Sequence, residues 1–342
     1  MRDDTTPEPP APAGAPFSTL TPDRVLDCVD ARGLLSNGRL LALNSYENRV
    51  YRVGLEDGSA VIAKFYRAAR WSDAAILEEH AFAQELADAE IPVVAPLAFD
   101  GVTLHHDGDV RYTLFPNRPG RTPELDRDDT LRWVGRFLGR IHARGATAKF
   151  RHRQRLTVGH FGQASVDFLL AGSFIPGDMR PAYEAAARAA VGQASAIIEM
   201  VGPVREIRLH GDCHVGNILW TEAGPHFVDL DDCMQGPAVQ DLWMLLSGDA
   251  DERAHQLGVV LEGYEDFFDF DRREIALIEA LRTMRILHYA AWLARRWSDP
   301  AFPMHFPWFN SQHYWQEHVL TLREQLAAMD EYPLQPPDED EY

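Results

Sequence analysis

The chain has 342 residues, of which 46% are hydrophobic and 25% charged, so it is long enough for two domains or for one large bilobed domain with a sizeable core. Its formal net charge of −19 disfavours nonspecific binding to nucleic acid or to an anionic membrane surface. It contains no long apolar run and no basic start followed by an apolar segment, so we expect neither a transmembrane helix nor a signal peptide.

The two ends of the chain differ in composition from the rest. Residues 1–17 are rich in Pro, Ala and Thr without hydrophobic periodicity, which predicts a disordered leader. Residues 333–342 are rich in Pro and then acidic, which predicts a solvated acidic tail. We expect neither segment to take part in chemistry.

Residues 18–116 are predicted to form a strand-rich N-terminal lobe. Residues 48–55 alternate apolar and polar side chains, as a half-buried strand does, and residues 59–66 follow a short Glu-Asp-Gly turn and complete a hairpin. A helix is expected over residues 71–86. Residues 111–115 are predicted to form a further strand, which ends at a proline.

Residues 117–332 are predicted to form a mainly helical C-terminal lobe. Helices are expected over about 127–144, 164–172, 181–200, 238–247, 251–266, 273–297 and 311–330, and short strands near 218–220 and 227–230. We therefore predict an α+β protein with two lobes. Ligand sites favour the cleft between such domains.

One segment carries the strongest chemical signal. Residues 209–217 read Leu-His-Gly-Asp-Cys-His-Val-Gly-Asn, and residues 226–232 read His-Phe-Val-Asp-Leu-Asp-Asp. Phosphoryl transfer from ATP needs a carboxylate that orients the acceptor hydroxyl and oxygen ligands that hold Mg²⁺ against the phosphates. We assign Asp212 as the catalytic base. Asn217 and Asp229 are the expected magnesium ligands, and Asp229 is also counted as catalytic.

A lysine within an apolar strand is the expected residue for binding the phosphates of the nucleotide. Lys64 lies within Val-Ile-Ala-Lys-Phe, where burying an ammonium group is costly unless an anion meets it. We expect the phosphates and an acidic partner on the following helix to provide that charge. Glu79 is the preferred partner because the apolar residues three, four and seven positions later share its face, and Glu78 is the alternative.

His210, Cys213 and His214 also suggest a zinc site. No second Cys/His pair has the spacing of a structural zinc site, so we expect His210 to pack beneath the magnesium site and Cys213 to be a buried thiol. The chain has three cysteines, Cys28, Cys213 and Cys233. So few cysteines, in an odd number, argue against a disulfide framework and fit a reducing cytoplasm.

The motif His-Gly-Asp-x-His-x-Gly-Asn with a downstream Asp-x-Asp resembles the aminoglycoside phosphotransferase and choline kinase superfamily. The sequence of this motif and of further stretches more closely resembles the stress response kinase A family of bacterial serine/threonine protein kinases. The stretches that carry this resemblance are residues 43–51, 64–67, 209–220, 227–246, 296–303 and 306–308. Together they span roughly residues 18–330, and their combination is specific where each alone is not.

The resemblance implies a bilobed protein-kinase-like fold and further nucleotide contacts. No Gly-x-Gly-x-x-Gly precedes the strand lysine, but Ser45, in the turn between two strands, corresponds to a position that contacts ATP in the family. Backbone groups near Phe115 and Asn117 are expected to lie beside adenine. Asp241 resembles the helix aspartate that braces the catalytic loop.

The implied function is an ATP- and Mg²⁺-dependent kinase that phosphorylates Ser/Thr hydroxyls of proteins, including itself, in a stress response. We expect a cytoplasmic monomer that binds no nucleic acid and no membrane. One alternative is a phosphotransferase for a small molecule such as an amino alcohol, a sugar or an antibiotic. Another is a pseudokinase scaffold that binds nucleotide without turnover, against which the complete set of catalytic residues speaks.

Three features leave the interpretation open. Where protein kinases have Asp-Phe-Gly, this chain has Asp229-Leu-Asp, and Asp231 and Asp232 are either close to the metal or simply solvated. Residues 230–237 contain no Ser, Thr or Tyr, so we predict activity without phosphorylation of that segment. The aromatic residues of 289–309 form either a substrate platform or, by our preference, internal packing.

Overall fold

The computed structural model describes residues 16–331, so the predicted acidic tail and all but two residues of the predicted leader lie outside the described residues. The described chain forms two compact units. The first unit comprises residues 16–73, 96–117 and 295–307, and the second comprises 74–95, 118–294 and 308–331.

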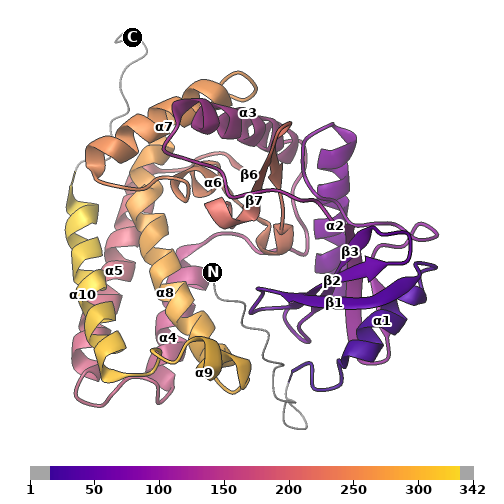
Figure 1. The fold of residues 1–342 in the computed structure, drawn as a ribbon. Helices are drawn as coiled ribbons and strands as arrows, with labels where there is room; N and C mark the ends of the chain where they lie inside the picture. The colour runs from indigo at the N-terminus through magenta and orange to yellow at the C-terminus, as the bar shows by residue number, and fades with distance from the viewer. Residues whose placement is uncertain (1–15, 332–342) are drawn as a thin grey trace. The chain divides into compact units, whose positions relative to one another are not determined.

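The first unit is built on a five-stranded antiparallel sheet with the order β1-β2-β3-β5-β4 (Figure 1). Its elements are α1 (Pro22–Asp30), β1 (Ser36–Leu43), β2 (Arg49–Leu55), β3 (Ala60–Tyr66), β4 (His105–Asp107), β5 (Val110–Pro116) and α9 (Ala301–His305). The strands predicted at 48–55, 59–66 and 111–115 are confirmed as β2, β3 and β5. The pattern did not predict α1 or α9.

The core of the first unit lies between the sheet and α1. Val61 and Phe65 of β3 are buried together with Val25 and Val29 of α1. Successive side chains of a strand point to opposite faces of the sheet. Lys64, between two residues of this core, therefore faces away from α1.

The second unit is mainly helical. Its longer helices are α2 (Asp73–Asp88), α3 (Asp128–Gly145), α4 (Ala164–Ala171), α5 (Arg180–Val201), α7 (Ala250–Tyr264), α8 (Ile278–Arg296) and α10 (Gln312–Asp330). Its short helical segments are the π-helix η1 (Val158–Gln163), the 3-10 helices η2 (Val215–Asn217), η3 (Leu230–Asp232) and η4 (Arg272–Leu277), and α6 (Val239–Trp243). Two small antiparallel sheets pair β6 (Glu206–Leu209) with β9 (Met234–Pro237) and β7 (Ile218–Thr221) with β8 (Gly224–Phe227).

The seven predicted C-terminal helices are confirmed, although α6 is shorter than the predicted 238–247 and the first turns of the predicted 273–297 are 3-10 helix. The strand predicted at 227–230 was wrong beyond its first residue, because β8 ends at Phe227. Asp229 has φ 59° and ψ 64°, a left-handed conformation that lies outside the extended region of a regular strand.

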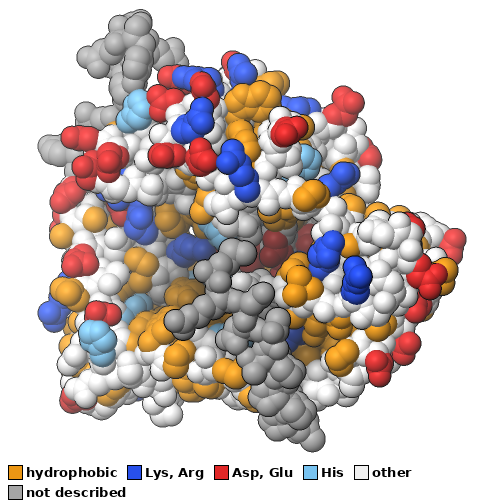
Figure 2. All heavy atoms as spheres, viewed as in Figure 1, with side chains coloured by type: hydrophobic (Ala, Val, Ile, Leu, Met, Phe, Trp, Pro, Cys, Tyr) orange, Lys and Arg blue, Asp and Glu red, His pale blue; other side chains and the backbone are white. Residues whose placement is uncertain are grey.

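Helices α3 and α7 of the second unit approach each other closely. A Cβ atom on Gly135 would lie 2.1 Å from the carbonyl oxygen of Val260, and one on Gly139 would lie 2.3 Å from that of Tyr264. Acidic and basic side chains are mixed with hydrophobic ones over this part of the surface (Figure 2), and Arg132 pairs with Glu262 at 2.7 Å. None of the described helices is both long and apolar enough to cross a membrane.

Candidate active site

The predicted catalytic loop follows β6 in the second unit. Its first residues are His210 and Gly211, and Gly211 has φ +86°, which a side chain would strain. A Cβ atom there would also lie 2.1 Å from the carbonyl oxygen of Asp232. The loop can therefore approach the following segment this closely only with glycine at this position.

Asp241 of α6 holds the start of this loop. Its carboxylate accepts hydrogen bonds from the backbone N–H of His210 at 2.7 Å and of Gly211 at 2.8 Å. The ring of His142 contacts the same carboxylate at 3.0 Å, and the other ring nitrogen of His142 lies 2.9 Å from the hydroxyl of Tyr264. Asp241 and His142 are fully buried. The brace that the sequence predicted for Asp241 is present.

Asp212, the predicted base, has two basic neighbours. Arg285 Nη1 of α8 lies 2.7 Å from its Oδ1, and His214 Nε2 lies 3.5 Å from its Oδ2. Burial opposes ionisation of Asp212, but the contact with His214 and the positive charge of Arg285 outweigh it and hold the pKa of this carboxyl well below its usual range. The carboxylate is thus kept ionised, as a proton acceptor must be.

The two predicted metal ligands lie at one end of the β7–β8 hairpin. The carbonyl oxygen of Asn217 accepts a hydrogen bond from the N–H of Val228 at 3.0 Å, and Asp229 is the next residue. The side-chain Nδ2 of Asn217 donates to the backbone carbonyl oxygen of Asp212 at 2.9 Å. An amide donates only through nitrogen, so this contact does not use Oδ1 of Asn217, the atom predicted to bind the metal.

These residues fit a divalent cation. The amide oxygen of Asn217 and the exposed carboxylate of Asp229 are hard oxygen donors, the kind that magnesium and calcium prefer. The left-handed backbone of Asp229 is a costly conformation of a kind that is concentrated at functional sites. Their assignment as metal ligands stays a prediction.

The residues around this centre have mainly structural contacts. His210 Nε2 lies 2.9 Å from the carbonyl oxygen of Val228, so its ring joins the catalytic loop to the segment that carries Asp229. Cys213 is buried, and burial raises the pKa of its thiol well above its usual value. Asp231 is also buried, which excludes a solvated carboxylate at that position.

The predicted nucleotide-binding residues of the first unit lie on its sheet and on the loop after β1. Lys64 is only 5% exposed and pairs with Val50 and Thr113 on the flanking strands. Ser45 is half-buried in the loop of residues 43–48, here called the phosphate loop. Phe115 belongs to β5 and Asn117 follows it, and both are half-buried.

Glu78 and Glu79 of α2 have different environments within the second unit. The carboxylate of Glu78 accepts hydrogen bonds from the backbone N–H groups of residues 151, 152 and 153 at 2.7–3.0 Å. Glu79 is 3% exposed and lies 3.7 Å from a guanidinium nitrogen of Arg153. Both glutamates therefore have partners within their own unit, and the choice of Glu79 over Glu78 as the partner of the strand lysine stays a prediction.

Sequence reasoning missed Arg285 and Arg153. Arg285 belongs to no short motif, and only its position in the fold brings it to the predicted base. In the aromatic region 289–309, Phe302, Phe306 and Phe309 are buried, as the packing interpretation requires, whereas Tyr289 and Trp308 are exposed.

Comparisons with known proteins show the family to which this chain belongs. A profile of the phosphotransferase enzyme family matches residues 39–278. The chain is 44% identical over 319 residues to stress response kinase A of Escherichia coli strain K12, with 93% of this chain and 96% of that protein covered. It is 44% identical over 331 residues, with the same coverage, to the serine/threonine protein kinase RdoA of Salmonella typhimurium.

Among solved structures, amicoumacin kinase hAmiN in complex with AMP-PNP, Ca²⁺ and Ami has the same fold. The TM-score is 0.69 at 18% identity, with 92% of this chain and 96% of that chain covered. The fold is thus the kinase-like fold that the sequence predicted, and its class is that of kinase-type phosphotransferases. The chain belongs to the phosphotransferase enzyme family and, within it, to the group of stress response kinase A.

Proposed function

We propose that this chain transfers the γ-phosphate of ATP to Ser/Thr hydroxyl groups of proteins, including its own, as part of a cytoplasmic stress response. The observation that carries the proposal is the 44% identity over 93% of the chain with proteins named stress response kinase A and serine/threonine protein kinase RdoA. The near-complete coverage supports a common activity for the whole chain rather than for one part of it.

The proposed base is Asp212. Its ionised carboxylate accepts the proton of the acceptor hydroxyl while the hydroxyl oxygen attacks the γ-phosphorus. The bond between the γ-phosphorus and the bridging oxygen breaks, and ADP leaves. Arg285, 2.7 Å from this carboxylate, and the side-chain amide of Asn217, on the backbone carbonyl of the same residue, support its position.

The proposed metal is Mg²⁺, held by Asn217 and Asp229. When bound, it supplies positive charge to the phosphate oxygens. Lys64 adds a second positive charge for the phosphates, with Glu79 as its proposed partner. Backbone groups at Phe115 and Asn117 form hydrogen bonds with the edge of adenine, and the hydroxyl of Ser45 donates to a phosphate oxygen.

A second candidate function is phosphorylation of a small molecule. It is favoured by the solved structure of the same fold, whose name is that of an amicoumacin kinase and whose complex contains Ami as well as AMP-PNP. One fold supports several acceptors, so the fold alone does not choose between them.

The test is transfer of label from γ-labelled ATP with Mg²⁺ by the wild type, Asp212→Ala and the matched control Asp266→Asn. Asp266 is an exposed carboxylate paired with Arg136 at 2.7 Å on the helical surface. Acceptors are the protein itself, a generic basic protein and a panel of small alcohols. Label on serine or threonine that is lost in Asp212→Ala, by a factor of about 10² or more, and retained in the control supports the proposal.

Label found only on a small molecule would replace the protein-kinase proposal with the second candidate. Nucleotide binding without transfer to any acceptor would favour the pseudokinase scaffold. These outcomes separate the acceptor question from the question of catalysis.

A further inference from the structure

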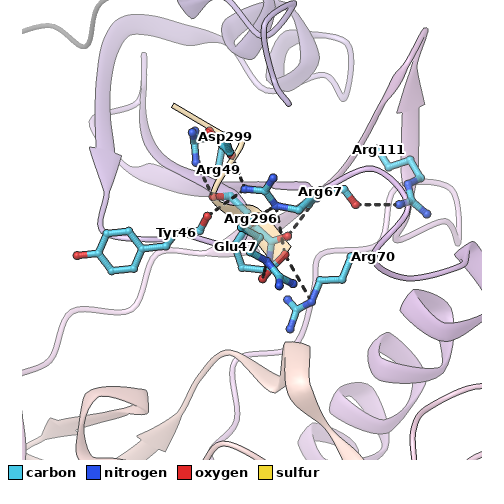
Figure 3. A network of polar contacts seen from close by, with 9 residues as sticks. Tyr46, Glu47, Arg49, Arg67, Arg70, Arg111, Arg296 and Asp299 are labelled. Atoms are coloured by element: carbon cyan, nitrogen blue, oxygen red, sulfur yellow. Dashed lines mark hydrogen bonds and ion pairs between the residues drawn. The ribbon is translucent and has the colours of Figure 1, made fainter. Parts of the chain in front are cut away.

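Five buried charged residues of the first unit form a group that includes one residue of the phosphate loop (Figure 3). We call it the Glu47 cluster, and its members are Glu47, Arg67, Arg70, Arg296 and Asp299. The carboxylate of Glu47 lies 3.2 Å from Arg67 Nε, 3.7 Å from Arg70 Nε and 2.6 Å from Arg296 Nε. Arg67 Nη2 lies 2.7 Å from Asp299 Oδ2. The five side chains are between 4% and 15% exposed.

Arg67 controls the backbone of the phosphate loop. Its Nε donates to the carbonyl oxygen of Glu47 at 2.9 Å and its Nη2 to that of Tyr46 at 3.3 Å. Its own backbone N–H donates to Oδ1 of Asn48 at 3.2 Å. One arginine therefore holds three consecutive residues of the loop.

These contacts set the direction of two peptide groups. In a planar trans peptide the carbonyl oxygen and the following N–H point in opposite directions. Because the carbonyl groups of Tyr46 and Glu47 face Arg67, the N–H groups of Glu47 and Asn48 point away from it. Backbone N–H groups aligned in this way are what a phosphate-binding turn needs, and glycine-rich loops usually provide them.

Two members of the cluster, Arg296 and Asp299, come from far along the chain. Asp299 lies 232 residues after Arg67. Its Oδ1 accepts a hydrogen bond from the N–H of Ala301 at 3.1 Å, so the carboxylate also holds the start of α9. The ring of Tyr46 contacts the rings of His305 and Phe306, with centroids 5.1 and 4.8 Å away. Residues 296–306 thus support the phosphate loop at both Tyr46 and Glu47.

A gain in folding stability is a poor explanation for burying these five charged side chains. Burying charges carries a desolvation penalty that ion pairing often fails to recover, and apolar residues in the same space frequently give equal or greater stability. The cluster holds three guanidinium groups and two carboxylates. Because it is retained at this cost and Arg67 also binds two carbonyl groups of the loop, we take its role to be fixing the geometry of the loop.

We propose that the Glu47 cluster replaces glycine as the element that fixes the phosphate loop, and that Arg67, Arg296 and Asp299 are positioning residues for the phosphates of ATP. The inference rests on the proposed use of ATP by this chain but not on the identity of the acceptor. It also assigns a role to residues 296–303, a stretch singled out in the sequence and not used by the catalytic residues.

The experiment measures binding of a non-hydrolysable ATP analogue with Mg²⁺ by calorimetry, and KM for ATP and kcat in the transfer assay. The variants are Asp299→Asn, which keeps an oxygen for α9, and Arg67→Lys, which keeps the charge but not the planar fork. Asp271→Asn is the matched control, because Asp271 forms an exposed pair with Arg273 at 2.6 Å. Thermal unfolding gives the Tm of each variant, and binding is measured at a temperature well below it, where the variant is folded.

We expect Kd and KM for the nucleotide to rise about tenfold or more in both variants while kcat changes much less, since a displaced loop weakens the grip on the phosphates. The effect of the double variant Arg296→Gln/Glu47→Gln on Kd should differ from the sum of the effects of the two single variants, as expected for residues of one network. Folded Asp299→Asn and Arg67→Lys proteins that bind the analogue as tightly as the control would overturn the inference while leaving the proposed function intact. A wild type that binds no ATP analogue would overturn both.

Discussion

Arg285 Nη1 lies 2.7 Å from Oδ1 of Asp212, so the predicted catalytic base is paired with a cation from a helix that begins more than sixty residues later in the chain. The guanidinium side chain is 44% exposed, whereas the carboxylate side chain is 23% exposed. On its other oxygen, Asp212 faces His214 and the side-chain amide of Asn217, each at 3.5 Å. The carboxylate is therefore oriented from two sides.

Replacing Arg285 by Gln should lower kcat roughly tenfold, because a base that loses one of its orienting contacts is less well aligned with the acceptor. Binding of an ATP analogue with Mg²⁺ should remain within about twofold of the wild type, since Arg285 contacts the base and not the predicted metal ligands. Arg285→Lys should retain an intermediate rate. Steady-state kinetics and calorimetry check these values.

The control for this prediction is Arg188→Gln, which removes an exposed guanidinium that pairs with Glu184 on α5. It should leave kcat unchanged. A rate for Arg285→Gln equal to that of this control would show that the pair with Asp212 has no role in catalysis.

Asp229→Asn should raise the Mg²⁺ concentration needed for half-maximal activity by about tenfold or more, because it removes a carboxylate from a site with few protein ligands. Asparagine tolerates the left-handed backbone that Asp229 adopts at φ 59°, so the variant should fold. Titration of activity with Mg²⁺ after treatment with a chelator gives the measurement. Asp232→Asn, three residues later at the end of the 3-10 helix that Asp229 precedes, is the comparison and should shift the requirement far less.

Asp241→Ala should destabilise the protein by about 3–5 kcal/mol, because it leaves the buried N–H groups of His210 and Gly211 without their carboxylate and breaks the contact with His142. Chemical denaturation measures the free energy of unfolding. Asp249→Ala removes a carboxylate that caps α7 and should cost only about 1 kcal/mol. Equal losses for the two variants would contradict the bracing role of Asp241.

Short-range patterns were sufficient to predict the catalytic loop and most of the regular structure. The residues Asp212, Asn217 and Asp229 fall within one loop and hairpin, so their spacing in the sequence largely determines their neighbourhood. The strands β2 and β3 follow from alternation and a turn. The start of α1 also had a local signal, since Thr21 caps the helix and Pro22 is its first residue, but its short and polar sequence obscured it.

Contacts between distant segments could not be predicted in this way. Nothing in the stretch around Arg296 indicates that it pairs with Glu47, and nothing around Arg285 indicates Asp212. Such pairs depend on how whole elements pack. The choice between Glu78 and Glu79 was similar, because adjacent helix residues differ in surroundings only once the helix has packed.

Glu274 should make the stability of the protein depend on pH near neutrality. It is 2% exposed and accepts a hydrogen bond from the N–H of Val239, the first residue of α6, at 2.9 Å. Burial raises the pKa of this carboxyl from 4.5 to about 7; the hydrogen bond from Val239 opposes that rise, Asp271 adds to it, and Arg273 also opposes it.

Between these two pKa values the folded protein binds a proton at Glu274 that the unfolded chain has released. The free energy of unfolding contributed by this group is therefore full below pH 4.5 and is lost as the pH rises through about 7. In Glu274→Gln this dependence is absent. The stability of the wild type relative to the variant should fall by on the order of 3 kcal/mol between pH 4.5 and pH 8.

Denaturant unfolding of the two proteins across this pH range provides the test, with Glu262→Gln as the control because Glu262 is an exposed carboxylate of α7 paired with Arg132. Glu274 holds the start of the helix that carries Asp241, so ionisation of Glu274 should also loosen the brace of the catalytic loop. Hydrogen exchange at the N–H groups of His210 and Gly211 should then accelerate with pH more in the wild type than in Glu274→Gln, after correction for the intrinsic rate. Identical stability profiles for the wild type and Glu274→Gln would show that folding does not raise the pKa of Glu274.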